Sequence, residues 1–321
     1  VKVSLRGGHL KAKTADDAFR FQAGGLIAAD TAWYSADDNV VKANDWGNGT
    51  EIRYARLFIL GKVWNHWNFK LQYDFEGPGA LKDASLEYTG LRKYTEIPLN
   101  IKVGFYKEPF SLEELTMAKF TTFMERALPN AMAPSRNVGV QLASSGGVYQ
   151  GGWTAAAGWF TGGVIAENDN GNDESNAFAG RLTLAPWAAK TQVLHLGGAV
   201  EYRNYDNSSI RIRSRPEAHT AEHRMVDTGD FTADSTLKWG AELAGVYGPF
   251  SVQGEYIYTH VNNYNGTGAD AGLNGWYGFA SWLLTGESRS YLSKSGVFGR
   301  IKPKGVVGRG GWGAWELVGR Y

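Results

Sequence analysis

The sequence predicts an all-β fold, a transmembrane antiparallel β-barrel. Three observations predict it: alternating apolar and polar residues, no long apolar run, and a regular succession of short and long connections. Alternation is clearest at 67–76, where Trp67, Phe69, Leu71, Tyr73 and Phe75 alternate with Asn68, Lys70, Gln72, Asp74 and Glu76. Because successive side chains of a strand point to opposite faces, one face is apolar and the other is polar. The pattern returns at 194–203 and 237–243, as expected for strands that separate lipid from a water-filled lumen.

The composition is compatible with a barrel but is not specific to it. No segment approaches the roughly 20 consecutive apolar residues of a membrane helix, whereas only every second residue of a barrel strand needs to be apolar. The 321 residues include 12 Trp, 16 Tyr and 15 Phe. Aromatic residues in such numbers are typical of the girdles of a barrel, and they also occur in sugar-binding β proteins.

Charge and cysteine content exclude several classes of partner and site. The 33 basic and 32 acidic residues give a net charge of +1, so the chain lacks the general basic character of a nucleic-acid-binding protein, although a local basic lining is compatible with it. The absence of cysteine excludes disulfides and thiolate metal sites. Since the chain begins at Val1, we expect a mature, exported form from which a signal peptide has been removed.

Thirteen candidate strands follow one another with almost no helix between them. They lie at about 20–35, 50–63, 67–76, 82–90, 98–106, 137–145, 151–161, 177–186, 190–204, 236–247, 250–262, 273–285 and 312–321. Long connections alternate with mostly short ones. The long ones are 36–49, 107–136, 162–176, 205–235 and 263–272. This rhythm is typical of barrels, whose periplasmic turns are short and whose external loops are long. Segment 286–311 departs from it, because it is long where a short periplasmic turn is expected.

The number of candidate strands bears on the extent of the barrel. Bacterial single-chain barrels have even strand numbers and both ends on the periplasmic side, so thirteen strands imply that more follow Tyr321. Alternatively, the count is wrong by one and 312–321 closes the barrel. We expect residues 1–19 to form an N-terminal periplasmic segment and residues 20–321 to form the pore domain, with its C-terminal strands missing.

The connection at 107–136 contains a segment of a different kind. Residues 111–128, SLEELTMAKFTTFMERAL, are rich in helix formers and lack period-two alternation. Ser111 followed by Glu114 resembles a capping box. A helix is therefore predicted here, folded into the lumen so that its apolar side chains find a dry environment. These apolar residues are Phe110, Leu112, Leu115, Phe120 and Phe123. The alternative is a helix on the external rim.

The stretch 103–142, VGFYKEPFSLEELTMAKFTTFMERALPNAMAPSRNVGVQL, resembles the third-loop region of the phosphate-selective porin O/P family. Supporting matches are FKLQYDF at 69–75, KDASLEYTGL at 82–91, LTGESR at 284–289, IKP at 301–303 and GAWEL at 313–317. The resemblance covers essentially the whole chain. It implies a sixteen-stranded barrel with about three strands after GAWEL, a homotrimer, and a pore narrowed by the inward third loop. It also implies passage of phosphate or polyphosphate along arginines and lysines of the lumen.

The residues that this resemblance assigns to the anion path are only partly present. Arg126 matches a basic residue at the family constriction, and Arg56 matches one of a pair of arginines whose other position is Ala55. Arg211, Arg213 and Arg215 in IRIRSR resemble arginines of the outer vestibule. The chain departs from the family pattern at three further positions. Leu26 and Glu114 stand where a phosphate-specific member has basic residues, and Lys82 stands where an acidic partner is expected, unless a register slip lets Asp83 serve.

Alternation and position suggest further lining residues. Lys102 faces the lumen because Ile101 and Val103 face outward. The candidates for the constriction are Lys107, Lys119, Arg126 and Arg136, with Glu113, Glu114 and Glu125 beside them. The alternative for the third-loop charges is ordinary i,i+4 pairing along a helix. The mixed charges on other polar faces suit a general or weakly anion-preferring pore, although each could be a wall residue paired across the lumen. These are Lys70, Arg181, Arg203, Lys238, Arg320, Asp74, Glu201, Glu242, Glu255 and Glu316.

No motif predicts an enzyme, a metal site or a cofactor. His219 and His223 have i,i+4 spacing, but two ligands do not complete a metal site. The acidic loop 168–173 could hold calcium, but its spacing is not that of an EF-hand. We therefore predict no catalytic activity.

We expect a porin of the bacterial outer membrane that lets small inorganic anions diffuse through its lumen, with phosphate and polyphosphate among the candidates. Its other partners would be outer-membrane lipid and two further copies of the chain. Two alternatives remain open. One is a structural or scaffold barrel, or an adhesin, without selective transport. The other is a secreted carbohydrate-binding β protein.

Overall fold

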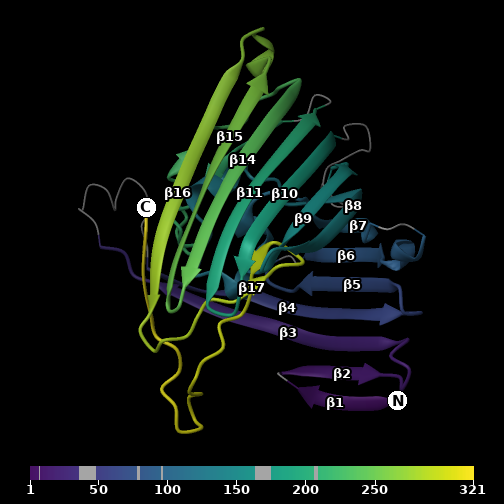
Figure 1. The fold of residues 1–321 in the computed structure, drawn as a ribbon. Coiled ribbons are helices and arrows are strands. Elements are labelled where there is room, and N and C mark those ends of the chain that lie inside the picture. Colours follow the sequence, from purple (N-terminus) through teal and green to yellow (C-terminus); the bar gives the residue numbers. More distant parts are fainter. Residues whose placement is uncertain (7, 36–47, 78–79, 95–96, 163–174, 206–208) are drawn as a thin grey trace.

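The computed structural model describes residues 1–6, 8–35, 48–77, 80–94, 97–162, 175–205 and 209–321. Its main feature is a fifteen-stranded antiparallel sheet in which strands adjacent in the sequence are adjacent in space (Figure 1). The strands are β1 (Lys2–Arg6), β2 (His9–Lys13), β3 (Arg20–Ala32), β4 (Gly49–Val63), β5 (Trp67–Asp74), β6 (Ala80–Tyr88), β7 (Leu99–Lys107), β8 (Arg136–Val148), β9 (Gly151–Phe160), β10 (Asn176–Ala188), β11 (Gln192–Asn204), β14 (Ser235–Tyr247), β15 (Phe250–Asn262), β16 (Ala271–Leu283) and β19 (Glu316–Arg320). All thirteen predicted strands are confirmed. The predicted loops 36–49 and 162–176 lie largely outside the described residues.

Two short strands precede the first predicted one, so the predicted start of the sheet at about residue 20 is wrong. β1 and β2 have five residues each and pair with one another, and β2 pairs with the first residues of β3. Alternation over five residues is too short to stand out in a sequence. The periplasmic location expected for residues 1–19 stays a prediction.

The two faces of the sheet differ in polarity as alternation predicts. On β14, Leu237, Trp239 and Leu243 are exposed, whereas Glu242 between them is 5% exposed. On β5, Leu71 and Tyr73 are exposed while Asp74 is buried. The apolar side chains therefore form the outer surface of the sheet rather than a dry interior, as in the wall of a barrel in lipid.

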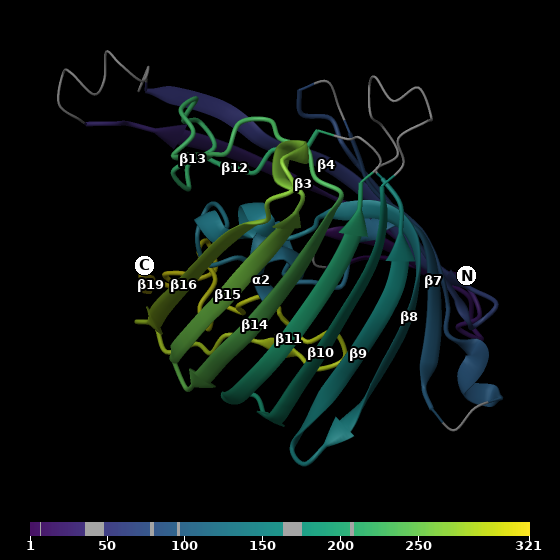
Figure 2. The same cartoon turned by 90° about the horizontal axis from the view of Figure 1, so that it is seen from above.

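The sheet curves around the third loop (Figure 2), and β1 and β19 are its edges. Among the described residues, these two edge strands do not pair with each other, so the barrel is not closed. Further strands beyond Tyr321 stay a prediction. Within the described ranges, no helix is long and apolar enough to cross a membrane.

The predicted helix over 111–128 is wrong in extent. The third loop contains one α-helical turn, α2 (Leu112–Leu115), and two 3₁₀ turns, η2 (Ala118–Phe120) and η3 (Leu128–Met132). The predicted cap is present in part, since the Glu114 N–H donates to Oγ of Ser111 at 3.1 Å. α2 ends at Thr116, where the backbone becomes extended. Carbonyls at the end of α2 bind side chains instead of a following helical turn, as described below.

The predicted position of the loop inside the lumen is confirmed. Leu112 packs in a buried cluster with Val193, Ala244 and Val246, which belong to β11 and β14. Phe110 packs with Met132 and Ile257. Figure 2 shows α2 on the concave side of the curved sheet. The alternative position on the external rim is therefore wrong.

Other connections carry small elements. The β16–β19 segment (residues 284–315) contains the hairpin of β17 (Tyr291–Leu292) and β18 (Val297–Phe298), and α2 contacts β18. The loop between β11 and β14 contains the hairpin of β12 (Arg213–Ser214) and β13 (Val226–Asp227). The turns η1 (Gly90–Lys93) and η4 (Tyr264–Gly266) lie in other loops.

Candidate pore constriction

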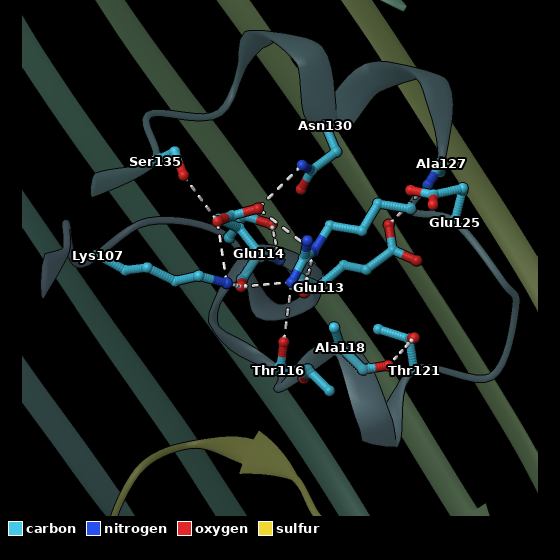
Figure 3. Close-up of polar contacts among 12 residues, drawn as sticks. Lys107, Glu113, Glu114, Thr116, Ala118, Thr121, Glu125, Ala127, Asn130 and Ser135 are labelled. Atoms are coloured by element: carbon cyan, nitrogen blue, oxygen red, sulfur yellow. Dashed lines mark hydrogen bonds and ion pairs between the residues drawn. The ribbon is translucent and has the colours of Figure 1, made fainter. Parts of the chain in front are cut away.

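Glu114 is the centre of the polar network that shapes the third loop (Figure 3). Its carboxylate lies 3.0 Å from Nζ of Lys107 and 3.3 Å from Nε of Arg126. It also accepts hydrogen bonds from Nδ2 of Asn130 at 3.1 Å and from Oγ of Ser135 at 3.2 Å. Glu114 is 4% exposed. Two cations and two neutral donors therefore replace the water that this buried carboxylate has lost.

Arg126 also binds the backbone of the loop. Nε donates to the Glu113 carbonyl at 3.0 Å, and Nη2 donates to the carbonyls of Glu114 and Thr116, each at 3.1 Å. Nζ of Lys107 also donates to the Glu114 carbonyl. These carbonyls would otherwise continue the helix beyond α2, which explains why it is one turn long. Lys107 and Arg126 lie at the predicted constriction, but both are engaged in holding the loop. Their pairing with Glu114 is not i,i+4.

The charge state of Glu114 follows from these contacts. Burial by itself would raise the pKa of its carboxyl. The charges of Arg126 and Lys107, helped by the hydrogen bond from Asn130, outweigh burial and lower the pKa to about 2. Glu114 is therefore ionised at neutral pH and cancels one of the two positive charges beside it.

A β-bulge in β4 turns an additional basic residue into the lumen. Ala28 pairs with Tyr54 and Ala29 pairs with Ile52, so Arg53 has no partner in β3. Its Nη2 donates to Oε2 of Glu125 at 3.0 Å, which places the side chain against the third loop. The bulge switches the outer face from even to odd positions, since Ile52 and Leu57 are both exposed. Sequence reasoning missed Arg53 because uninterrupted alternation puts it and Arg56 on opposite faces.

The guanidinium groups of Arg53 and Arg56 both lie over the Tyr54 ring at this bulge. Their Cζ atoms are 4.4 Å and 3.9 Å from its centroid. Nε of Arg56 donates to Asp74 at 2.6 Å. Arg56 thus faces the lumen as the resemblance implied, with Arg53 rather than Ala55 as its basic companion.

A second bulge lies in β6 at Lys82. Gln72 pairs with Asp83 and Tyr73 pairs with Leu81, so Lys82 has no partner in β5. Asp83 takes the lumen position through this register slip and lies 2.9 Å from Nζ of Lys70 and 3.6 Å from Arg136. The Lys82 side chain is close enough to Arg56, Arg136 and Arg53 to interact with them electrostatically. Within the described structure, Lys82 has no ion pair or hydrogen bond.

Seven basic side chains in this region share four carboxylates, which leaves three positive charges uncompensated within the set. The pairs are Arg53 with Glu125, Arg56 with Asp74, Lys70 and Arg136 with Asp83, and Lys107 and Arg126 with Glu114, while Lys82 is unpaired. Two other predicted cations, Lys102 and Lys119, have no carboxylate partner among the described residues. Nζ of Lys102 lies 4.0 Å from the Tyr106 ring centroid, and Nζ of Lys119 lies 5.5 Å from that of Phe58.

The predicted vestibule arginines are divided between two places. Arg213 and Arg215 line a cavity of about 200 Å³ together with Arg126 and Glu125. Arg211 does not line it and makes two hydrogen bonds to Asp227, at 2.7 Å and 2.6 Å. The Arg211 hydrogen bonds lower the pKa of the Asp227 carboxyl to about 2. Two of the three arginines therefore lie next to the constriction.

Of the two metal sites considered above, the one at His219 and His223 lies within the described residues. No group of three or more possible ligands is found there. Nδ1 of His219 lies 2.8 Å from the carboxylate of Glu51. The acidic loop 168–173 lies outside the described residues.

Comparison with known proteins gives a family match and two relatives. Residues 21–321 match the model of the family described as phosphate-selective porin O and P. Porin O of Pseudomonas aeruginosa is 28% identical over 359 residues, covering all of this chain and 76% of that protein. An uncharacterised protein of Caulobacter vibrioides is 29% identical over 313 residues, covering 94% of this chain and 60% of that protein.

Solved structures give more distant likenesses. Salmonella typhi OmpF in complex with daunomycin has a TM-score of 0.44 and 13% identity, covering 97% of this chain and 100% of that one. The trimer form of OmpT, an outer-membrane protein of Vibrio cholerae, has a TM-score of 0.42 and 10% identity, covering 94% and 98%.

Proposed function

Because this chain belongs to the phosphate-selective porin O and P family, and is an outer-membrane porin rather than an enzyme, we propose that it lets small inorganic anions diffuse passively through its lumen. The third loop, residues 107–136, narrows that path. The secreted carbohydrate-binding protein considered above is ruled out by membership in this family. The polar, charged inner wall favours a water-filled path over a scaffold barrel without transport.

The observation that supports anion preference is the charge imbalance around the third loop. A narrow aqueous pore selects ions mainly by the sign of the charge near its constriction, because low-dielectric walls focus the field. Within this set, seven basic side chains face four carboxylates, and Lys82 is the one that makes no ion pair in the described part of the chain. Arg53, Arg56, Lys82 and Arg136 are the residues to which we assign the preference, with Lys119 and the vestibule residues Arg213 and Arg215 at its approaches.

We propose a general or weak preference for anions rather than a filter for phosphate. A phosphate filter needs several guanidinium forks free to bind oxygen atoms. Here Arg126 is occupied by three carbonyls and by Glu114, and Arg56 is occupied by Asp74. Leu26 and Ala55 supply no charge. Phosphate would then pass as one anion among others.

Planar-bilayer recording under a potassium chloride gradient tests this function. We expect a reversal potential of the sign that anion permeation produces, and no block by micromolar phosphate. A cation-selective current contradicts the proposal, and block by micromolar phosphate favours the filter. The variant Lys82→Gln should lower the anion-to-cation permeability ratio by about tenfold. One unit charge at about 6 Å in water changes the energy of a monovalent ion by about 0.7 kcal/mol, with opposite signs for anion and cation. Lys62→Gln removes the same charge from β4 outside this set and is the matched control.

The homotrimer and the contact with outer-membrane lipid stay part of the proposal. Both follow from what the family resemblance implies. Chemical cross-linking in outer-membrane vesicles checks the oligomer, where three-chain species are expected and monomers alone contradict it.

A further inference from the structure

Two segments from opposite ends of the strands meet inside the lumen. The third loop follows β7, and the β16–β19 segment follows β16. Because β7 and β16 run in opposite directions, the two segments begin at opposite ends of the strands. Leu112 of the loop lies in one buried cluster with Val297 and Phe298 of that segment. The position of the narrowing loop therefore depends on what holds these two segments to the wall.

Glu255 of β15 holds the third loop directly. Its Oε2 accepts the Leu112 N–H at 2.9 Å, and its Oε1 accepts the Glu113 N–H at 2.7 Å. Oε1 also accepts the Tyr277 hydroxyl of β16 at 2.6 Å. Glu255 is 4% exposed. Three donors therefore converge on the two carboxyl oxygens of one buried side chain, which attaches the start of the loop to the wall.

The same wall residues reach the β16–β19 segment. Nε2 of Gln253 donates to the Tyr277 hydroxyl oxygen at 2.6 Å, and Oε1 of Gln253 accepts from Nη1 of Arg289 at 2.9 Å. The Arg289 guanidinium stacks over the Phe298 ring, with Cζ 3.7 Å from its centroid. Among the described residues, Arg289 has no ion pair. A chain of hydrogen bonds therefore leads from Arg289 to Glu255, with the donors oriented in one direction.

We propose that Glu255 is the positioning residue of the constriction, and that Tyr277 and Gln253 make its hold on the third loop depend on Arg289 of the β16–β19 segment. The proposal rests on the porin function proposed above, because it concerns what keeps the narrowest loop of the channel in place. When one of these hydrogen bonds is removed, the loop moves between an attached and a released position. The current through one pore then fluctuates instead of staying at one level.

Single-channel recording of the whole chain tests this role. Tyr277→Phe removes one hydroxyl and leaves the packing of the ring, so it should fold. We expect the released, higher-conductance level to become about fivefold more populated, as for the loss of one ordinary hydrogen bond. Glu255→Gln should have a larger effect, and Arg289→Gln an effect in the same direction.

Glu87→Gln is the matched control, because it makes the same substitution elsewhere on the lumen wall. Its carboxylate accepts a hydrogen bond from Asn68 at 2.9 Å on β5, far along the sheet from β15. We expect its current to stay steady.

The outcomes separate this proposal from the proposed function. If the released level is no more populated in Tyr277→Phe than in the unmodified protein and in Glu87→Gln, the positioning role is overturned. The reversal potential of the unmodified protein decides anion preference independently. A cation-selective protein whose current fluctuates in Tyr277→Phe but not in Glu87→Gln refutes the anion proposal and retains the positioning role. If Glu255→Gln does not fold, as shown by gel mobility before and after heating, Tyr277→Phe still decides.

Discussion

The Nε atom of Arg126 lies 3.3 Å from Oε2 of Glu114, so the arginine that most resembles a filter residue is paired with a buried carboxylate. Lys107 binds the same carboxylate at 3.0 Å. We therefore expect the proposed anion preference to depend less on Arg126 than the sequence alone suggests. It should depend more on cations such as Lys82, which reach the lumen through irregularities of the sheet.

Replacement of Glu114 should destabilise the barrel. Glu114→Gln leaves Lys107 and Arg126 without their shared carboxylate, and breaking a buried ion pair costs roughly 3–5 kcal/mol. Asn130→Ala removes one hydrogen bond to the same carboxylate and should cost about 1 kcal/mol. Urea unfolding in detergent micelles measures both. Equal losses for the two variants would show that Glu114 is not the centre of the network.

Acid should release the same network. The pKa of Glu114 is lowered to about 2 in the folded protein, so its contribution to stability is present above its ordinary pKa of about 4.3 and is lost as pH falls towards 2. We expect the difference in unfolding free energy between the unmodified protein and Glu114→Gln to be constant from pH 7 to about pH 5. It should shrink between about pH 4 and pH 2. A constant difference down to pH 2 would contradict the pairing.

The bulges predict which side chains contact water. The chain has no cysteine, so single cysteines can be placed without background. Arg53→Cys and Lys82→Cys should react with a membrane-impermeant thiol reagent in lipid vesicles, because both positions face the lumen. Leu57→Cys, on the outer face, should not react. Unreactive cysteines at both bulge positions would mean that strict alternation continues through β4 and β6.

Contact between the two lumen segments predicts a stability effect at Phe298. This side chain is fully buried against Leu112 and the wall, so Phe298→Ala should cost roughly 3–5 kcal/mol by leaving a cavity. It should also raise the single-channel conductance, because the third loop loses its support. Leu292→Ala in β17, where the side chain is 45% exposed, should stay within about 0.5 kcal/mol of the unmodified protein. Equal stability of the two variants would refute the contact.

The strands and the two faces of the wall were predictable from the sequence. Leu237, Trp239 and Glu242 are assigned to the correct faces by counting alone, because a period of two is a local property of an extended backbone. The inward third loop was also predictable from its apolar side chains and from the resemblance to a porin family. Both inferences use residues that are close together in the chain.

Tertiary structure alone decided what the third loop and the lumen charges do. Alternation assigns Arg53 and Lys82 to the outer face, yet the pairing of each strand with its neighbour inserts a bulge there and turns both inward. Helix formers in 111–128 produce a single α-helical turn, because Arg126 and Lys107 bind the carbonyls that a longer helix needs. Local pattern determines the direction of a side chain within one strand, whereas register and ion pairs depend on residues distant in the chain. Only the assembled barrel wall brings those residues together.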